Sequence, residues 1–129
     1  MGFLAFFAVA TGGAIGTLLR WLLAILLNPL LPNLPLGTLA VNLIGGLIIG
    51  IALGYFTQFP ALPSELRLFV ITGFCGGLTT FSAFSGETAL LLMRQQYGWA
   101  AALISTHLIG SLGMTFLGFM LVRYFLDRV

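Results

Sequence analysis

The sequence predicts an all-α membrane protein with four transmembrane helices and a break in the third. The 129 residues are 60% hydrophobic and 6% charged, whereas about a quarter of the residues in a soluble domain are charged. Four stretches are nearly free of charge, and each reaches the roughly 20 apolar residues that cross a hydrocarbon core. Within the third stretch, residues 76–85 read Gly-Gly-Leu-Thr-Thr-Phe-Ser-Ala-Phe-Ser, a composition that predicts an interrupted helix.

The first predicted span covers residues 3–27 and carries one charge, Arg20. No basic residue precedes it and it is long enough to cross the membrane, so we expect it to remain in the mature chain and not to be a cleaved signal peptide. Gly12 and Gly16 form a small-xxx-small pattern that lets helix backbones approach closely in lipid. We therefore expect this face to pack against another helix.

The second predicted span covers residues 36–59 and follows a connection, 28–35, that is rich in asparagine and proline. Its glycines at 46, 50 and 54 predict a second packing face. Asn42 lies in mid-span, four residues after Thr38 and so on the same face. A buried asparagine in lipid must find partners, and it serves either to join helices or to line a transport pathway.

The third predicted span covers residues 65–95, with Ser64 as its N-cap and a break near 76–80. An unpaired backbone group in hydrocarbon costs several kcal/mol. Irregular backbone therefore survives at that depth only where protein buries it or where it lines a cavity, an ion site or a pore. The break indicates a functional site.

Aromatic and hydroxyl side chains follow the break. Phe81 and Phe84 are three residues apart and share one helical face. Aromatic rings have positive edges that, like hydroxyl donors, contact an anion without offering it a full charge. This pattern suits a small anion that must lose its water, and ordinary helix packing is the alternative. The hydroxyl residues of the run are Thr79, Thr80, Ser82 and Ser85.

The fourth predicted span covers residues 98–126, with Tyr97 and Trp99 at the position of an interfacial aromatic belt. Ser111 and Thr115, four residues apart, either face the same site or bond to carbonyls of their own helix. We expect His107, which has no second ligand at metal spacing, to be a hydrogen-bonded residue inside the bundle.

The charges are few. The net charge of +2 is too small and too scattered for a nucleic-acid-binding surface. Four spans place Arg67, Arg123 and Arg128 on one side of the membrane and Arg94, with Arg20, on the other. Such a weak bias permits insertion in both orientations, which would allow an antiparallel, dual-topology homodimer.

Two charges approach the membrane interior. Arg20 either snorkels to the interface or attracts anions at a vestibule, and Glu87 either pairs within the bundle or serves a functional site.

The whole chain resembles the Fluc (CrcB) family of fluoride channels. The resemblance rests on the four-span size and on five motifs, which are Leu19-Arg20-Trp21, Gly37-Thr38-Leu39-Ala40-Val41-Asn42, the run 76–85, Glu87-Thr88 and Gly110-Ser111-Leu112. One departure is Ala83, where the family often has threonine. The resemblance implies a multi-pass protein of a prokaryotic plasma membrane that lets fluoride leave the cytoplasm passively.

The resemblance also implies an antiparallel homodimer with two fluoride pathways and a sodium ion on its two-fold axis. The sodium ligands would be the backbone carbonyls of Gly76 and Thr79, since hard cations prefer oxygen. The residues that the resemblance places along the fluoride pathway are Phe81, Phe84, Asn42, Ser82, Ser111, Thr115 and, near its mouth, Arg20. It gives no role to His107.

Other functions fit less well. A small four-helix proton-coupled multidrug exporter needs a membrane carboxylate, typically in the first span, and residues 3–27 contain none. A structural subunit of a larger complex would not need the helix break. An intramembrane serine protease built on Ser85, His107 and Glu87 lacks a Gly-x-Ser-Gly motif, so we expect no enzymatic activity.

Overall fold

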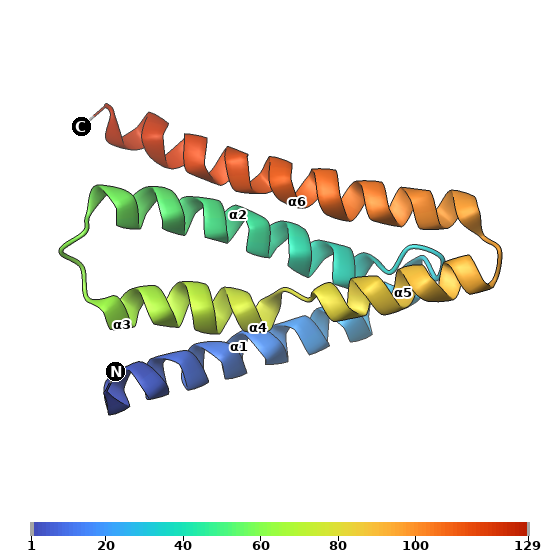
Figure 1. The fold of residues 1–129 in the computed structure, drawn as a ribbon, viewed down its shortest axis with the longest axis horizontal. Helices are drawn as coiled ribbons and strands as arrows, with labels where there is room; N and C mark the ends of the chain where they lie inside the picture. Colours follow the sequence, from blue (N-terminus) through green and yellow to red (C-terminus); the bar gives the residue numbers. More distant parts are fainter. Residues whose placement is uncertain (1, 129) are drawn as a thin grey trace.

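The computed structural model describes residues 2–128 as an all-helical chain. Four helical segments in it are long and apolar enough to cross a membrane, and they run Phe3–Leu30, Leu36–Gln58, Ser64–Met93 and Tyr97–Leu126. The segments lie side by side, and the two ends of the chain are at the same end of the bundle (Figure 1). This confirms the prediction of four apolar spans in an all-α protein.

The first, second and fourth segments are nearly continuous helices, whereas the third is divided. The elements in chain order are α1 (Phe3–Leu27), the 3-10 turn η1 (Asn28–Leu30), α2 (Leu36–Gln58), α3 (Ser64–Arg67), the π-helix η2 (Leu68–Cys75), α4 (Gly76–Leu78), α5 (Phe81–Met93) and α6 (Tyr97–Leu126).

The interruption of the third segment is narrower than the range 76–80. Gly76 to Leu78 remain helical, and only Thr79 and Thr80 leave the helix. Glycine permits a break but does not force one, and the Thr79 N–H still reaches the Cys75 carbonyl at 2.9 Å. The yellow strand of chain between α4 and α5 in Figure 1 is this two-residue break.

The start of the third segment differs from the prediction, and the start of α2 has a cap that was not predicted. Ser64 is the first helical residue and not the cap, because Pro63 holds the cap position and the Ser64 hydroxyl instead donates to Glu65 Oε2 at 3.4 Å. The start of α2 is capped from the preceding connection, where Asn28 Oδ1 accepts the N–H groups of Gly37 and Thr38 at 2.7 and 3.1 Å. These N–H groups would otherwise have no helical partner.

Glycines set the two main helix contacts. α1 packs on η2 and α4, where a Cβ atom added at Gly16 would meet the Phe74 carbonyl. α2 packs on α6, where a Cβ atom added at Gly50 would meet the Thr115 carbonyl. The small-xxx-small faces of both spans therefore bring backbones together, as predicted.

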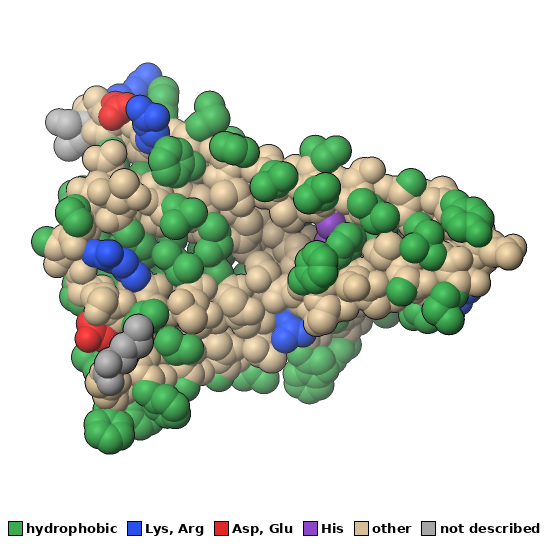
Figure 2. Space-filling model, in the orientation of Figure 1, with side chains coloured by type: hydrophobic (Ala, Val, Ile, Leu, Met, Phe, Trp, Pro, Cys, Tyr) green, Lys and Arg blue, Asp and Glu red, His purple; other side chains and the backbone are tan. Residues whose placement is uncertain are grey.

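The outside of the bundle is apolar. Large hydrophobic side chains stay exposed along all four spans, including Phe6, Leu18, Ile109 and Phe116. Figure 2 shows them spread over the visible face, with most of the visible charged side chains gathered toward one end. A surface of this kind fits a lipid environment.

Candidate functional site

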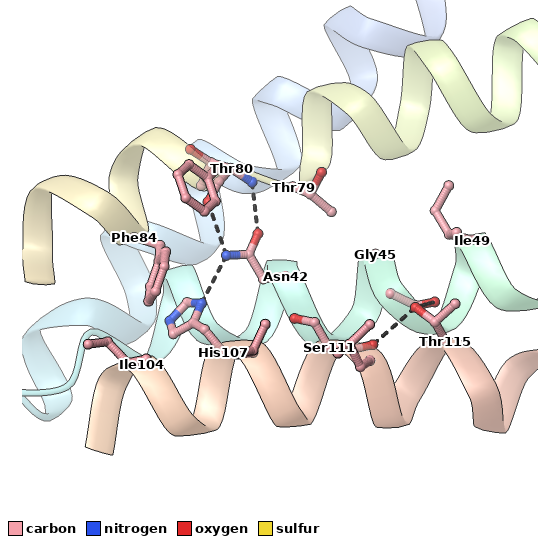
Figure 3. Close-up of a pocket in the computed structure, with 14 residues that line it drawn as sticks. Asn42, Gly45, Ile49, Thr79, Thr80, Phe84, Ile104, His107, Ser111 and Thr115 are labelled. Atoms are coloured by element: carbon pink, nitrogen blue, oxygen red, sulfur yellow. Dashed lines mark hydrogen bonds between the residues drawn. The ribbon is translucent and has the colours of Figure 1, made fainter. Parts of the chain in front are cut away.

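The break is held open by Asn42. Thr79 and Thr80 have extended backbone angles, with φ −82°, ψ 156° and φ −150°, ψ 114°. In a continuous helix the Thr80 N–H would donate to Gly76. Here it donates to Asn42 Oδ1 at 2.8 Å, while Asn42 Nδ2 donates to the Thr80 carbonyl at 3.1 Å (Figure 3). The side chain from α2 thus pairs with both backbone polar groups of Thr80 and stabilises the extended conformation.

The helix restarts directly after the break because Thr80 caps it. Its Oγ1 accepts the Ala83 N–H at 3.1 Å, which satisfies one of the free donors at the start of α5. The same hydroxyl lies 3.2 Å from Ser82 Oγ. The side chain of Thr80 therefore caps the first turn of α5, while the backbone N–H and carbonyl of Thr80 bond to the Asn42 side chain.

The break leaves carbonyl groups without a hydrogen bond. Within residues 2–128, no bond reaches the carbonyl oxygens of Gly76, Leu78 or Thr79 across the break, and Gly76 and Thr79 flank the start of the extended segment. An unpaired carbonyl inside a membrane protein needs a partner. The oxygens of Gly76 and Thr79 are therefore available to a cation or to another donor.

His107 on α6 is the third member of the Asn42 cluster. The second N–H of Asn42 Nδ2 points to His107 Nδ1, 3.0 Å away. His107 is 4% exposed, and its other nitrogen, Nε2, is buried with no hydrogen-bond partner in the part of the chain that the structure describes. The imidazole also packs on the Phe84 ring, with centroids 4.7 Å apart.

A cavity of about 540 Å³ opens beside this cluster between α2, α5 and α6. Its wall combines aromatic rings with a few polar groups. The rings of Phe81 and Phe84 meet edge to face at 5.5 Å, and Phe81 is 78% exposed. The polar residues at the wall are Asn42, Thr79, Thr80, His107, Ser111 and Thr115. Figure 3 shows Asn42 on α2 and His107, Ser111 and Thr115 along α6, with Thr79 and Thr80 facing them from the break.

The hydroxyl of Thr115 is held by backbone. It lies 3.0 Å from both the Gly46 and the Ser111 carbonyls. The second bond is the local contact to its own helix that the sequence favoured. Ser111 lines the same cavity one turn earlier.

A second cavity, of about 510 Å³, lies on the other side of the break. Thr80 lines both cavities. Arg20 Nε donates to the Gly77 carbonyl at 2.9 Å, so this charge contacts the backbone just before the break. Thr38 donates to Glu87 Oε2 at 3.0 Å, and the buried Glu87 Oε1 has no hydrogen-bond partner among the described residues.

The structure therefore groups most of the expected site residues but not all of them. Asn42, Phe81, Phe84, Ser111 and Thr115 share the first cavity with Thr79, and Arg20 lines the second. Ser82 and Gly76 line neither cavity.

His107 is a hydrogen-bonded residue inside the bundle, as predicted, but its place at this site was missed. The sequence did contain a signal, because His107, Ser111 and Thr115 are spaced by four residues and so share a face of α6. Its contact with Asn42, 65 residues away in the chain, could not be found in this way.

Known proteins that are similar to this chain fall in the family that the sequence motifs indicated. Residues 7–119 match the family described as CrcB-like protein, Camphor Resistance (CrcB). Relatives from several bacteria carry the name fluoride-specific ion channel FluC. The relative in Nitrosospira multiformis is 56% identical over 96% of this chain and 97% of its own. The relative in Pseudomonas paraeruginosa is 54% identical over 94% and 95%, and that in Nitrosomonas europaea is 51% identical over 92% and 93%.

Proposed function

The chain belongs to the CrcB-like protein family, and from this membership we propose that it is a passive, selective fluoride channel and not an enzyme. The observation that carries this proposal is the 56% identity to a fluoride-specific channel over 96% of the chain. The resemblance drawn from the helix-break motif agrees with it. The multidrug-exporter alternative has no support among these relatives. With four membrane spans and bacterial relatives, the protein is a multi-pass protein of the plasma membrane.

The anion pathway that we propose follows the first cavity. Fluoride is small and tightly hydrated, so a selective path must replace its water with several donors and be too narrow for chloride. Phe81 and Phe84 supply ring edges there, and Ser111 supplies a hydroxyl donor. Asn42 and Thr115 line the same wall, but their N–H and O–H donors already bond to Thr80, His107 and backbone carbonyls, so fluoride must compete for them. The described residues that line this cavity include no Lys or Arg, which suits conduction because fluoride must also leave each position.

Arg20 and Ser82 hold outer positions along this proposed path. Arg20 lines the second cavity, where its charge attracts anions to the neighbourhood of the break. Ser82 is exposed on the first turn of α5, beside the Thr80 hydroxyl. Fluoride entering by this route passes from a charged mouth to an uncharged wall of rings and hydroxyls.

We assign sodium to the break itself. The carbonyl oxygens of Gly76 and Thr79 fit a hard cation, since hydrogen bonds within the described chain leave both oxygens free. A bound sodium ion supplies fixed positive charge that balances these carbonyl dipoles. Asn42 prepares this site, because it accepts the Thr80 N–H that would otherwise bond to the Gly76 carbonyl in a continuous helix.

A second copy of the chain completes the proposed site. One chain leaves Phe81 78% exposed, and the two carbonyls assigned to sodium, at Gly76 and Thr79, are fewer than the six or so oxygens typical of a hard cation. A two-fold axis at the break doubles the carbonyls and covers the exposed face of α5. The two subunits of this dimer run antiparallel, which requires insertion in both orientations.

Flux from liposomes tests the function. Purified protein is reconstituted at low density into liposomes loaded with fluoride or with chloride, and efflux is started by a potassium ionophore. Fast fluoride efflux with chloride retained supports the channel. Absence of passive flux of either anion, in protein that remains a dimer by light scattering, would remove it. Fluoride flux that appears only with an imposed proton gradient would favour an exporter.

Labelling of the termini tests the dual topology. A tag at each end of the chain is probed in intact cells and in permeabilised cells. Antiparallel assembly requires both termini to be reached from both faces of the membrane. Detection of every copy on one face would contradict the arrangement without affecting the anion assignment.

A further inference from the structure

The cluster formed by Asn42, Thr80 and His107 constrains the state of the histidine. A carboxamide has two N–H donors and one oxygen acceptor. The Thr80 N–H needs the oxygen and the Thr80 carbonyl needs an N–H, so two bonds to one residue fix which way the amide of Asn42 faces. The remaining N–H points to His107 Nδ1 at 3.0 Å.

His107 Nδ1 must therefore accept. Only a neutral imidazole with its proton on Nε2 presents an acceptor at Nδ1. The tautomer with a proton on Nδ1, and the doubly protonated imidazolium, would both direct an N–H at the N–H of Asn42. Burial leaves little room for adjustment, because His107 is 4% exposed and is stacked on Phe84.

We propose that His107 is a positioning residue for Asn42: in its neutral, Nε2-protonated form it holds the amide in the orientation that keeps the helix broken at Thr80. The histidine acts through Asn42, which touches the backbone of the break. Protonation of the ring converts the acceptor into a donor and releases the amide. Fluoride conduction then falls as the pH is lowered through the titration of His107. This inference rests on the proposed function only for its flux measurements.

Among residues 2–128, no other titratable group hydrogen-bonds within the cluster. On α5 the ionisable side chain is Glu87, whose carboxylate accepts from Thr38 and lines the second cavity. Arg20 of α1 lines that same cavity. The ionisable side chain of α2 is Tyr55, whose ring packs against Phe59 at the other end of that helix from Asn42. A change with pH in the Asn42 contacts at the break is therefore assigned to the titration of His107.

Nitrogen NMR tests the tautomer directly. His107 is the sole histidine of the chain, so protein labelled with ¹⁵N-histidine, with any affinity tag removed, gives the two ring nitrogens of one residue. We expect an unprotonated Nδ1 and a protonated Nε2 at neutral pH, and a mixture of tautomers in Asn42→Ala. A protonated Nδ1, or a tautomer unchanged in Asn42→Ala, would overturn the proposal. This readout does not depend on conduction, so it separates failure of the inference from failure of the proposed function.

Flux through three variants tests the positioning role. His107→Leu removes the acceptor and should lower fluoride flux about tenfold or more. His107→Gln carries a carbonyl acceptor and should recover much of that loss. Thr106→Val is the control, since the Thr106 hydroxyl bonds only to Ala102 and Leu103 of its own helix. Equal losses in the leucine and glutamine variants, with both still dimeric, would overturn the assignment.

The pH profile adds a measurement on the unchanged protein. Between pH of about 7.5 and 4.5, a range that reaches well below the ordinary titration of histidine, wild-type flux should fall reversibly while His107→Gln should not follow it. Protein-free liposomes correct for leakage of hydrogen fluoride at the acid end. A wild-type profile that is flat, or that His107→Gln reproduces, would overturn the pH sensitivity.

Discussion

The carboxamide of Asn42 pairs with both backbone polar groups of Thr80, at 2.8 Å and 3.1 Å, and so replaces a helix hydrogen bond with contacts from another helix. A break in a membrane helix normally exposes polar backbone to hydrocarbon. This pairing satisfies Thr80 and leaves the unbonded carbonyls at Gly76 and Thr79. One side chain thus separates the cation position that we propose from the aromatic wall that begins at Phe81.

Asn42→Asp should suppress fluoride flux at least about a hundredfold while the dimer remains assembled. The carboxylate keeps an acceptor for the Thr80 N–H but loses both donors, and its charge repels an anion across a few ångströms of poorly screened space. Liposome efflux measures the effect. Asn33→Asp makes the same change in the turn before α2, away from both cavities, and should leave flux unchanged. Similar flux from the two variants would place the pathway elsewhere.

Phe81→Ile should reduce fluoride flux strongly without loss of assembly. Isoleucine keeps an apolar side chain at this position but has no ring edge to present to the anion. Phe6→Ile is the matched control, because Phe6 is also exposed, at 68%, and lies on α1 away from the cavity. Efflux from both variants is compared with dimer content by size-exclusion chromatography. Wild-type flux in Phe81→Ile would contradict the proposed role of the ring.

Gly50→Ala should destabilise the protein by about 1–3 kcal/mol, because the added methyl group would meet the Thr115 carbonyl where α2 and α6 pack. Gly113→Ala is the comparison, since nothing lies within 4 Å of a Cβ atom added there. Alanine also favours helix over glycine. Thermal unfolding followed by tryptophan fluorescence should give a lower midpoint for the first variant only. Equal midpoints would show that α2 and α6 accommodate the added methyl group without loss of stability.

Removal of sodium should weaken the dimer and lower fluoride flux. Two free carbonyls from each chain, at Gly76 and Thr79, would face one another without a cation between them. Protein is dialysed exhaustively against N-methyl-D-glucamine at constant ionic strength, and readdition of sodium should restore both properties. Unchanged assembly and unchanged flux after complete removal would contradict a sodium ion at the break.

The apolar spans could be predicted from sequence because they depend on length and hydropathy alone. The first span was predicted at 3–27 and the structure has Phe3–Leu27. The break was placed near 76–80 because glycine marks potential interruption, yet Gly76 and Gly77 stay helical. Its true position depends on Asn42, which lies 38 residues away. No local pattern carries that information.

The sequence predicted which residues line the site, but not the contacts that they make with one another. The run 76–85 identified Phe81 and Phe84, the motif at 37–42 identified Asn42, and the structure brings these side chains to one cavity. Contacts between helices were not predictable from the sequence. Examples are the hydrogen bond between Asn42 and His107 and that between Arg20 and the Gly77 carbonyl. The π-helix η2 was also missed, because a run of apolar residues does not distinguish π from α hydrogen bonding.

The reversal potential in a planar bilayer tests the central claim, passive and selective fluoride conduction, most directly. Purified protein is placed between solutions with a tenfold gradient of fluoride and equal chloride on both sides. A fluoride-selective channel predicts a steady current that reverses near 59 mV in magnitude, about the value for a tenfold gradient of a monovalent ion. A reversal potential near zero, or no current from protein that remains dimeric, would contradict the account.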